Sequence, residues 1–253
     1  MLPIILSLLV FLYGIVIGSF LNVLIYRIPK KENFVTTRSH CMSCGYQLEW
    51  YDLVPLFSYI VLGGKCRKCK TKLSVQYPLI EGLNGLLYLF VFWKYQISIE
   101  SLLYCLLLSA LLALSVIDFR TFEIPVGFNV FILLLGVIRV FTDLSNWKSY
   151  VIGFFAVSVF LYLLFLVSGG RAIGGGDIKL MAACGLLLGW KLVLFAFIIG
   201  CIFGSVIHLL RMKFSGEEHM LAMGPYLSLG VLAALFFGNC FIDWYFGLMS
   251  AAI

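Results

Sequence analysis

Long apolar runs separated by short polar stretches dominate the pattern of the chain. A membrane-spanning helix needs about 20 mostly apolar residues, because the hydrocarbon core is about 30 Å thick and each residue rises about 1.5 Å. Eight segments approach this requirement, and the sixth is short enough for a tilted or partly re-entrant helix: 2–26, 78–95, 100–117, 125–141, 149–168, 178–190, 192–210 and 225–248. The pattern therefore predicts an all-α polytopic membrane protein with about eight transmembrane helices.

The composition narrows the alternatives to this prediction. Of 253 residues, 62% are hydrophobic and only 12% are charged, whereas a soluble domain carries about 25% charged residues. This balance excludes a soluble globular fold, a disordered chain and a coiled coil. It leaves a helical membrane protein, because a transmembrane β-barrel would read as short alternating segments.

The positive charge is concentrated in one polar segment, residues 27–77. The segment contains nine lysines and arginines and three acidic residues, so it holds the whole formal net charge of +6. Basic loops face the cytoplasm, so we expect 27–77 to lie inside and both termini outside. The expected partner of this loop is the anionic inner leaflet of the lipid bilayer, not nucleic acid. The expected organisation is a first transmembrane helix (1–26), a cytoplasmic loop domain (27–77) and a transmembrane helix bundle (78–253).

The loop contains two Cys-x-x-Cys pairs, Cys41 with Cys44 and Cys66 with Cys69, and 21 residues separate the pairs. Two such knuckles at this spacing are typical of a tetrahedral zinc site. Cytosolic thiols are kept reduced, which favours zinc over the alternative of redox-active or disulfide-bonded pairs. A loop this small would gain much of its folding energy from the metal. Gly45 directly follows the first pair and can supply a turn.

Two aspartates lie at predicted helix ends on the cytoplasmic side. Asp118 ends the third apolar segment, and Asp177 begins the sixth after three glycines that allow a substrate backbone to approach closely. A carboxylate in a bilayer is costly, so acids beside apolar spans must have a structural or functional reason. Two carboxyl groups that share a site hold one proton between them, which an aspartic protease uses to activate water. Negative charge is favoured at a helix N-terminus, where Asp177 lies, and disfavoured at a C-terminus, where Asp118 lies, so we expect Asp177 to be the ionised base and Asp118 the protonated partner.

The residues alone also allow the two aspartates to have no catalytic role. Asp118 would then pair with Arg120, while Asp177 would cap its helix and pair with Lys179. A transporter whose acids bind ions predicts acids near mid-span. A scaffold that docks a partner through its zinc loop predicts aspartates that tolerate change.

The motifs together resemble the bacterial type IV prepilin peptidases (leader peptidases), which are polytopic aspartic proteases. The resemblance covers nearly the whole chain, and its segments in order are Gly18-Ser-Phe-Leu-Asn22-Val, Tyr26-Arg27-Ile-Pro29, the four-cysteine loop, Tyr77-Pro78-Leu-Ile-Glu81, Asp118 with Ile124-Pro125, Gly174-Gly-Gly-Asp177-Ile-Lys179 and Gly224-Pro225-Tyr226-Leu. Presenilin-like proteases also use Gly-x-Gly-Asp, but they have no four-cysteine loop of this kind.

The resemblance implies an aspartic endopeptidase of the bacterial cytoplasmic (inner) membrane with its active site facing the cytoplasm. Such an enzyme cleaves the basic leader from prepilins and pseudopilins of type IV pilus and type II secretion systems. It implies that Asp118 and Asp177 are the catalytic pair. Many members also N-methylate the new N-terminus with S-adenosylmethionine, and the large loop is tied to that transfer. Candidates for binding the substrate or the methyl donor are Gly174, Gly176, Lys179 and Glu81, with snorkelling or pairing at the membrane interface as the alternative for the last two.

Two positions depart from the family pattern. Val126 stands where members often have an acidic residue after Ile-Pro, but a two-carboxylate mechanism does not need that residue. Leu53 stands where members commonly have Asn in the loop. An enzyme that cleaves without methylating therefore stays open beside a bifunctional one.

Overall fold

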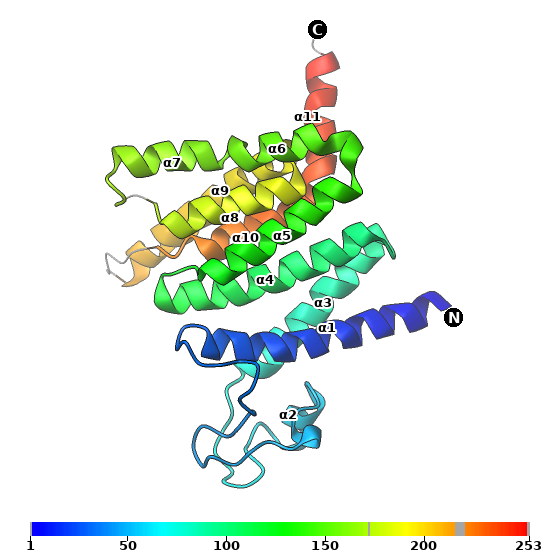
Figure 1. Cartoon of the computed structure of the whole chain (residues 1–253), viewed down its shortest axis with the longest axis vertical. Helices are drawn as coiled ribbons and strands as arrows, with labels where there is room; N and C mark the ends of the chain where they lie inside the picture. Colours follow the sequence, from blue (N-terminus) through cyan, green and yellow to red (C-terminus); the bar gives the residue numbers. More distant parts are fainter. Residues whose placement is uncertain (1, 172, 216–220, 252–253) are drawn as a thin grey trace. The chain divides into compact units, whose positions relative to one another are not determined.

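The computed structural model describes residues 2–171, 173–215 and 221–251, which are helical apart from loops and two isolated β-bridges (Figure 1). The longer helices are α1 (Leu2–Arg27), α3 (Gln76–Tyr95), α4 (Ile99–Thr121), α5 (Val126–Thr142), α6 (Trp147–Ala156), α7 (Ser158–Val167), α8 (Gly175–Leu188), α9 (Trp190–Ser215), α10 (Gly224–Ala233) and α11 (Asn239–Ala251). The short elements are η1 (Trp50–Asp52), α2 (Phe57–Val61), η2 (Leu144–Asn146) and a π-helical turn, η3 (Ala234–Gly238). The chain divides into two compact units, Met1–Ala113 and Leu114–Ile253.

The all-helical class predicted from the sequence is confirmed for the described residues. Among the residues that the structure describes, five helical stretches are long and apolar enough to cross a membrane, namely Pro3–Arg27, Ile99–Thr121, Leu144–Val167, Trp190–Lys213 and Gly224–Leu248. The other three predicted segments are helical but fall short of this standard. Polar residues lower the hydropathy of α3, whereas α5 has 17 residues and α8 has 14, fewer than the roughly 20 that a straight span needs.

The first unit is built on the packing of α1 along α3. Gly14 and Gly18 lie four residues apart on α1, and a Cβ atom there would come within 2.8 Å and 2.7 Å of α carbons of α3. This spacing of small residues lets two helix backbones approach closely. Asn84 of α3 donates a hydrogen bond to the main-chain oxygen of Gly14 (2.7 Å) and accepts one from Ser109 of α4 (2.8 Å). The buried polar groups between the helices are thereby satisfied.

Both helices of this pair anchor the large loop between them, which carries η1 and α2 (Figure 1). Arg27, at the end of α1, donates hydrogen bonds to the main-chain oxygens of Thr37 (2.8 Å) and Arg38 (3.3 Å). Glu81 of α3 accepts a hydrogen bond on Oε2 from the N–H of Leu56 (2.8 Å), just before α2. The loop is therefore fixed at its start and near its middle.

In the second unit, α8 is buried along most of its length and packs against α5, α6, α7 and α9. Gly185 of α8 and Gly153 of α6 contact each other so closely that neither position has room for a side chain. A helix that is surrounded by other helices can be apolar on every face. This packing explains why α8 is mostly apolar.

Candidate functional site

Asp118 lies in the last turn of α4 and is 4% exposed. Its Oδ2 atom accepts a hydrogen bond from the main-chain N–H of Gly224 (2.9 Å), the first residue of α10. A Cβ atom on Gly224 would come within 2.7 Å of the same oxygen. The carboxylate therefore needs both a free N–H and a residue without a side chain at position 224.

Asp177 lies in the first turn of α8 and is also buried. Its N–H donates to the main-chain oxygen of Gly174 (3.1 Å), the residue that precedes the helix. A Cβ atom on Gly174 would lie 3.0 Å from Asp177 Oδ2, whereas Gly175 faces open space. The Oδ1 atom of Asp177 is buried and has no hydrogen-bond partner among the described residues. A buried polar atom without a protein partner is rare and leaves Oδ1 available to bind water or substrate.

The two aspartates come from separate helices of the second unit and lie close enough for the charge on one to act on the other. Such a pair binds one proton between its two carboxyl groups, because like charges at short range cannot easily coexist. Two carboxyl groups that share one proton can supply a base and an acid, which is what the addition of water to an amide requires.

The remaining residues predicted for this site divide into two groups. Gly174 and Gly176 lie in the turn that leads into Asp177, and a Cβ atom on Gly176 would come within 3.0 Å of Ile124. Lys179 is exposed, and within the part of the chain that the structure describes no ion pair joins it to Asp177. Glu81 belongs to the first unit, beside the large loop.

Asn129 is a residue of this site that the sequence did not indicate. It is buried on α5, and its Nδ2 donates a hydrogen bond to the main-chain oxygen of Gly176 (3.3 Å), next to Asp177. Its own Oδ1 is a second buried oxygen without a partner among the described residues. The signal in the sequence is weak, a single Asn in an apolar run. Gly224 belongs to one of the family-like motifs, but the sequence did not indicate its contact with Asp118.

The four cysteines of the large loop lie together as predicted. Their sulfur atoms are all within 4.8 Å of one another, with Cys41 and Cys69 3.8 Å apart and Cys44 and Cys66 4.0 Å apart. Disulfide sulfurs would be about 2.05 Å apart. Zinc–sulfur bonds of about 2.3 Å in a tetrahedron hold sulfurs about 3.8 Å from one another, so the residues fit a zinc ion.

Each cysteine pair is held in the same kind of tight turn. The N–H of Cys41 donates to the oxygen of Tyr46 (2.8 Å), and the N–H of Cys66 donates to the oxygen of Thr71 (2.9 Å). Gly45 and Lys70, each four residues after the first cysteine of its pair, have φ angles of 68° and 58°. Hydrogen bonds to Thr71 lower the pKa of Cys69 to about 6, which favours the thiolate that a metal binds.

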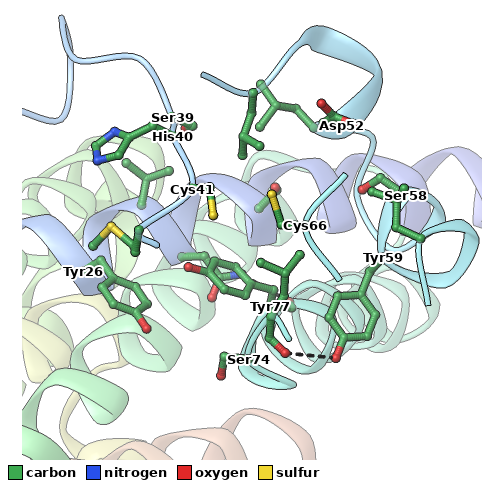
Figure 2. A pocket seen from close by; sticks show the side chains of 18 of the residues that line it. Tyr26, Ser39, His40, Cys41, Asp52, Ser58, Tyr59, Cys66, Ser74 and Tyr77 are labelled. Carbon is green, nitrogen blue, oxygen red and sulfur yellow. Dashed lines mark hydrogen bonds between the residues drawn. The ribbon is translucent and has the colours of Figure 1, made fainter. Parts of the chain in front are cut away.

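A cavity of about 410 Å³ is lined by the four-cysteine loop and the adjoining ends of α1 and α3 (Figure 2). Cys41 and Cys66 line it from the loop, together with Tyr26 of α1 and Tyr77 and Glu81 of α3. The rings of Tyr26 and Tyr77 are stacked, with an interplanar angle of 4° and centroids 6.1 Å apart. The cavity has the size of a small-molecule site.

Comparison with known proteins assigns the chain to a family. Models of the bacterial peptidase A24 N-terminal domain and of the type IV leader peptidase family match residues 12–95 and 105–209. A prepilin leader peptidase/N-methyltransferase of Legionella pneumophila is 30% identical to this chain, over 93% of this chain and 93% of that protein. The chain belongs to the type IV leader peptidase family.

Other relatives within this leader peptidase family agree. Proteins of the same name from Burkholderia pseudomallei and Pseudomonas putida are 33% and 30% identical, over 90% and 89% of this chain and 84% and 88% of their own lengths. No solved structure matches the chain. The four cysteines fall in the region matched by the N-terminal domain model, and both aspartates fall in the region matched by the leader peptidase model. The family expected from the sequence motifs is confirmed.

Proposed function

We propose that this family member cleaves the basic leader from type IV prepilins and pseudopilins, with Asp118 and Asp177 as its catalytic pair. The observation that carries the proposal is the convergence of two buried carboxyl groups from separate helices in the leader peptidase region of the chain. The names of the relatives, prepilin leader peptidase/N-methyltransferase, support the choice of substrate.

The hydrogen bonds support different roles for the two carboxyl groups, because Asp118 Oδ2 accepts from Gly224 whereas Oδ1 of Asp177 is buried without a partner among the described residues. A hydrogen bond to a charged group contributes about 1.5–3 kcal/mol, whereas a helix dipole contributes about 0.3–1 kcal/mol. The N–H of Gly224 therefore outweighs the dipole of α8 and favours the negative charge on Asp118. In this mechanism ionised Asp118 takes a proton from water, and protonated Asp177 donates to the carbonyl oxygen of the scissile bond. This order of roles is the reverse of the one that the helix dipoles alone suggest.

The membrane arrangement that we propose has eight spans, including the less apolar α3 and the shorter α5 and α8. The basic segment 27–77 then faces the cytoplasm beside anionic lipid, and Asp118 and Asp177 lie at the cytoplasmic edge of the inner membrane. That location suits a substrate whose basic leader remains in the cytoplasm. The proposed division of the chain is a first helix (1–26), a loop domain (27–77) and a protease bundle (78–253), serving type IV pilus or type II secretion systems.

A second part of the proposal concerns the large loop. Zinc, held by Cys41, Cys44, Cys66 and Cys69, would supply folding energy to a segment that has a small core. The relatives' names also include N-methyltransferase, so the proposed enzyme methylates the new N-terminus after cleavage. S-adenosylmethionine would supply the methyl group on a positively charged sulfur.

Cleavage of a purified prepilin by the full chain in detergent tests the catalytic pair. We expect Asp118→Asn and Asp177→Asn each to lower the rate at least about 100-fold, because each variant removes an acid or a base. Asp243→Asn is the matched control, since Asp243 is an acid on α11, outside the aspartate pair. A rate near that of the unmodified chain in either dyad variant would refute the mechanism.

A further inference from the structure

The short helix α2 has one exposed apolar face. Its three large apolar side chains, at positions i, i+3 and i+4, are Phe57, Ile60 and Val61, and they are 65%, 73% and 63% exposed. The other side of the helix, with Ser58 and Tyr59, is half-buried and lines the cavity (Figure 2). Large apolar side chains gathered on one exposed face mark a surface that another protein or a membrane covers.

Contacts of Glu81 fix where α2 lies along the helices of the first unit. Glu81 accepts a hydrogen bond from the N–H of Leu56 (2.8 Å), which precedes α2, and its α carbon packs against Gly18 of α1. Gly18 lies nine residues before Arg27, the last residue of α1, and this length of helix rises about 13 Å. The headgroup layer on each side of the hydrocarbon core is about 5–8 Å thick. With Arg27 at the outer surface of that layer, α2 begins at the depth of the outer acyl-chain carbons.

The surface of α1 at this depth is apolar as well. Val16 and Phe20, two residues before and after Gly18, are 55% and 47% exposed. Large apolar side chains that remain exposed on a helix of this length and hydropathy face lipid in the proposed membrane arrangement. The exposed face of α2 therefore lies at a level where lipid already covers a neighbouring helix.

The chain on both sides of α2 is basic. Residues 53–80 contain five lysines and arginines and no acidic residue. Arg67 forms an ion pair with Asp52. The other four are exposed, namely Lys65, Lys68, Lys70 and Lys72. An apolar helix face close to exposed lysines is the pattern of a helix that lies in the interface of a membrane with anionic lipid.

We propose that α2 is inserted into the cytoplasmic leaflet, with Phe57, Ile60 and Val61 among the acyl chains and the four exposed lysines at anionic headgroups. The inference rests on the proposed membrane arrangement, in which residues 27–77 face the cytoplasm. It adds a membrane contact in the middle of the large loop, besides the two helices that flank it. Because the other side of α2 lines the cavity, the leaflet would hold one wall of the cavity in place.

An additional tryptophan on α2 tests the insertion in bilayers whose acyl chains carry bromine, because bromine quenches only tryptophans that lie among those chains. The full chain with Phe57→Trp is reconstituted with zinc, and without prepilin, into nanodiscs of phosphatidylcholine and phosphatidylglycerol. The emission of the unmodified chain is subtracted. Ile60→Trp is a second variant on the same face, and the exposure of both positions leaves room for the larger ring.

Val35→Trp is the matched control. Val35 is also an exposed apolar residue of the large loop. It lies two residues before Thr37, whose main-chain oxygen accepts a hydrogen bond from Arg27 at the end of α1. The control position is therefore close to the cytoplasmic end of α1 and outside the hydrocarbon core.

We expect brominated lipid to lower the additional emission at least about 2-fold in Phe57→Trp and Ile60→Trp, because an interfacial helix lies about 5–10 Å into the boundary between headgroups and acyl chains. The emission of Val35→Trp should change little. Equal quenching at positions 35 and 57, or no quenching at 57 and 60, would overturn the proposal. Quenching at position 57 should weaken in nanodiscs of phosphatidylcholine alone, and quenching independent of phosphatidylglycerol would refute the contact assigned to the lysines.

Prepilin cleavage by the same samples separates this inference from the proposed function. A chain that cleaves prepilin while positions 57 and 60 stay unquenched would refute the insertion alone, since the apolar face would then be covered by protein or exposed to water. Quenching at these positions in a chain that does not cleave prepilin would support the insertion and refute the proposed function.

Discussion

Asp118 depends on the main-chain N–H of Gly224, and this dependence makes a glycine part of the proposed active site. A Cβ atom at position 224 would meet the side chain of Asp118 rather than main chain, so the side chain can give way and the fold can survive. The carboxylate would then move off its hydrogen-bond donor. A substitution here thus separates the position of the catalytic group from the stability of the fold.

For Gly224→Ala we expect prepilin cleavage to fall about 100-fold, because a displacement of about 1 Å in a catalytic group has that effect. Gly247→Ala is the matched control, since Gly247 lies on α11, outside the aspartate pair, and nothing lies within 4 Å of a Cβ atom there. The measurement is kcat/KM for prepilin, with the unfolding temperature of each variant as a check. Equal rates for the two variants would contradict the role given to Gly224.

The residues whose chemistry lies in their own side chains were predictable from the sequence. Cysteine pairs at knuckle spacing and aspartates beside apolar runs are unusual wherever they occur, so Cys41, Cys66 and Asp177 could be singled out. The contributions of Asn129 and Gly224 lie in contacts with residues far along the chain. Those contacts depend on how α5, α8 and α10 pack, which no local pattern encodes.

At the scale of single elements, the two cysteine knuckles have the same construction with different residues at the strained position. Gly45 and Lys70 both adopt positive φ. A residue with a Cβ atom loses about 1–2 kcal/mol in this conformation, whereas glycine does not. The first knuckle avoids this strain because Gly45 has no Cβ atom, whereas Lys70 strains the second knuckle.

Gly45→Ala should therefore weaken zinc binding about 5- to 30-fold, the factor that corresponds to about 1–2 kcal/mol. Nothing lies within 4 Å of a Cβ atom at this position, so backbone strain is the only expected cause. Lys70→Ala is the control, because it leaves that strain as it is. Competition between the full chain and a chromogenic chelator measures the affinity, and equal affinities in the two variants would contradict the interpretation.

Most long helices were predictable because apolar runs and helices coincide in a membrane protein. The short elements were not. The helix α2 follows Leu56, whose φ of 58° is unusual for a residue with a side chain, and Glu81 holds its N–H. The predicted segment 149–168 is divided into α6 and α7 at Val157. Both features arise from contacts or backbone geometry rather than from hydropathy.

At the scale of the whole molecule, the proposed chemistry is divided between two compact units. The cysteines and the cavity belong to Met1–Ala113, and the aspartate pair belongs to Leu114–Ile253. The sequence predicted both sites but not this partition, whose boundary falls inside the single continuous helix α4. Hydropathy predicts eight spans, but it does not show that α8 is surrounded by other helices, because a buried helix and a lipid-facing helix have similar apolar patterns.

Removal of zinc should therefore affect the two activities differently. We expect a chelator to abolish methylation of the cleaved product, because the four cysteines hold the large loop to which the proposed methyl transfer is tied, and to leave most of the prepilin cleavage intact. Parallel assays of methylation and leader cleavage on the same chelated sample measure the difference. Parallel loss of both activities, restored together by added zinc, would contradict a division of labour between the units.

Each knuckle closes its own hydrogen bonds, so the metal ties together two turns joined by residues 48–64. The entropy lost on closing a flexible loop grows with the logarithm of its length, about 0.6 kcal/mol for each doubling. Insertions or deletions between the knuckles should therefore change metal affinity little, provided that Leu56 still reaches Glu81. This segment can accordingly vary in length during evolution while the metal centre persists, which makes it the natural position at which to graft a tag or a reporter.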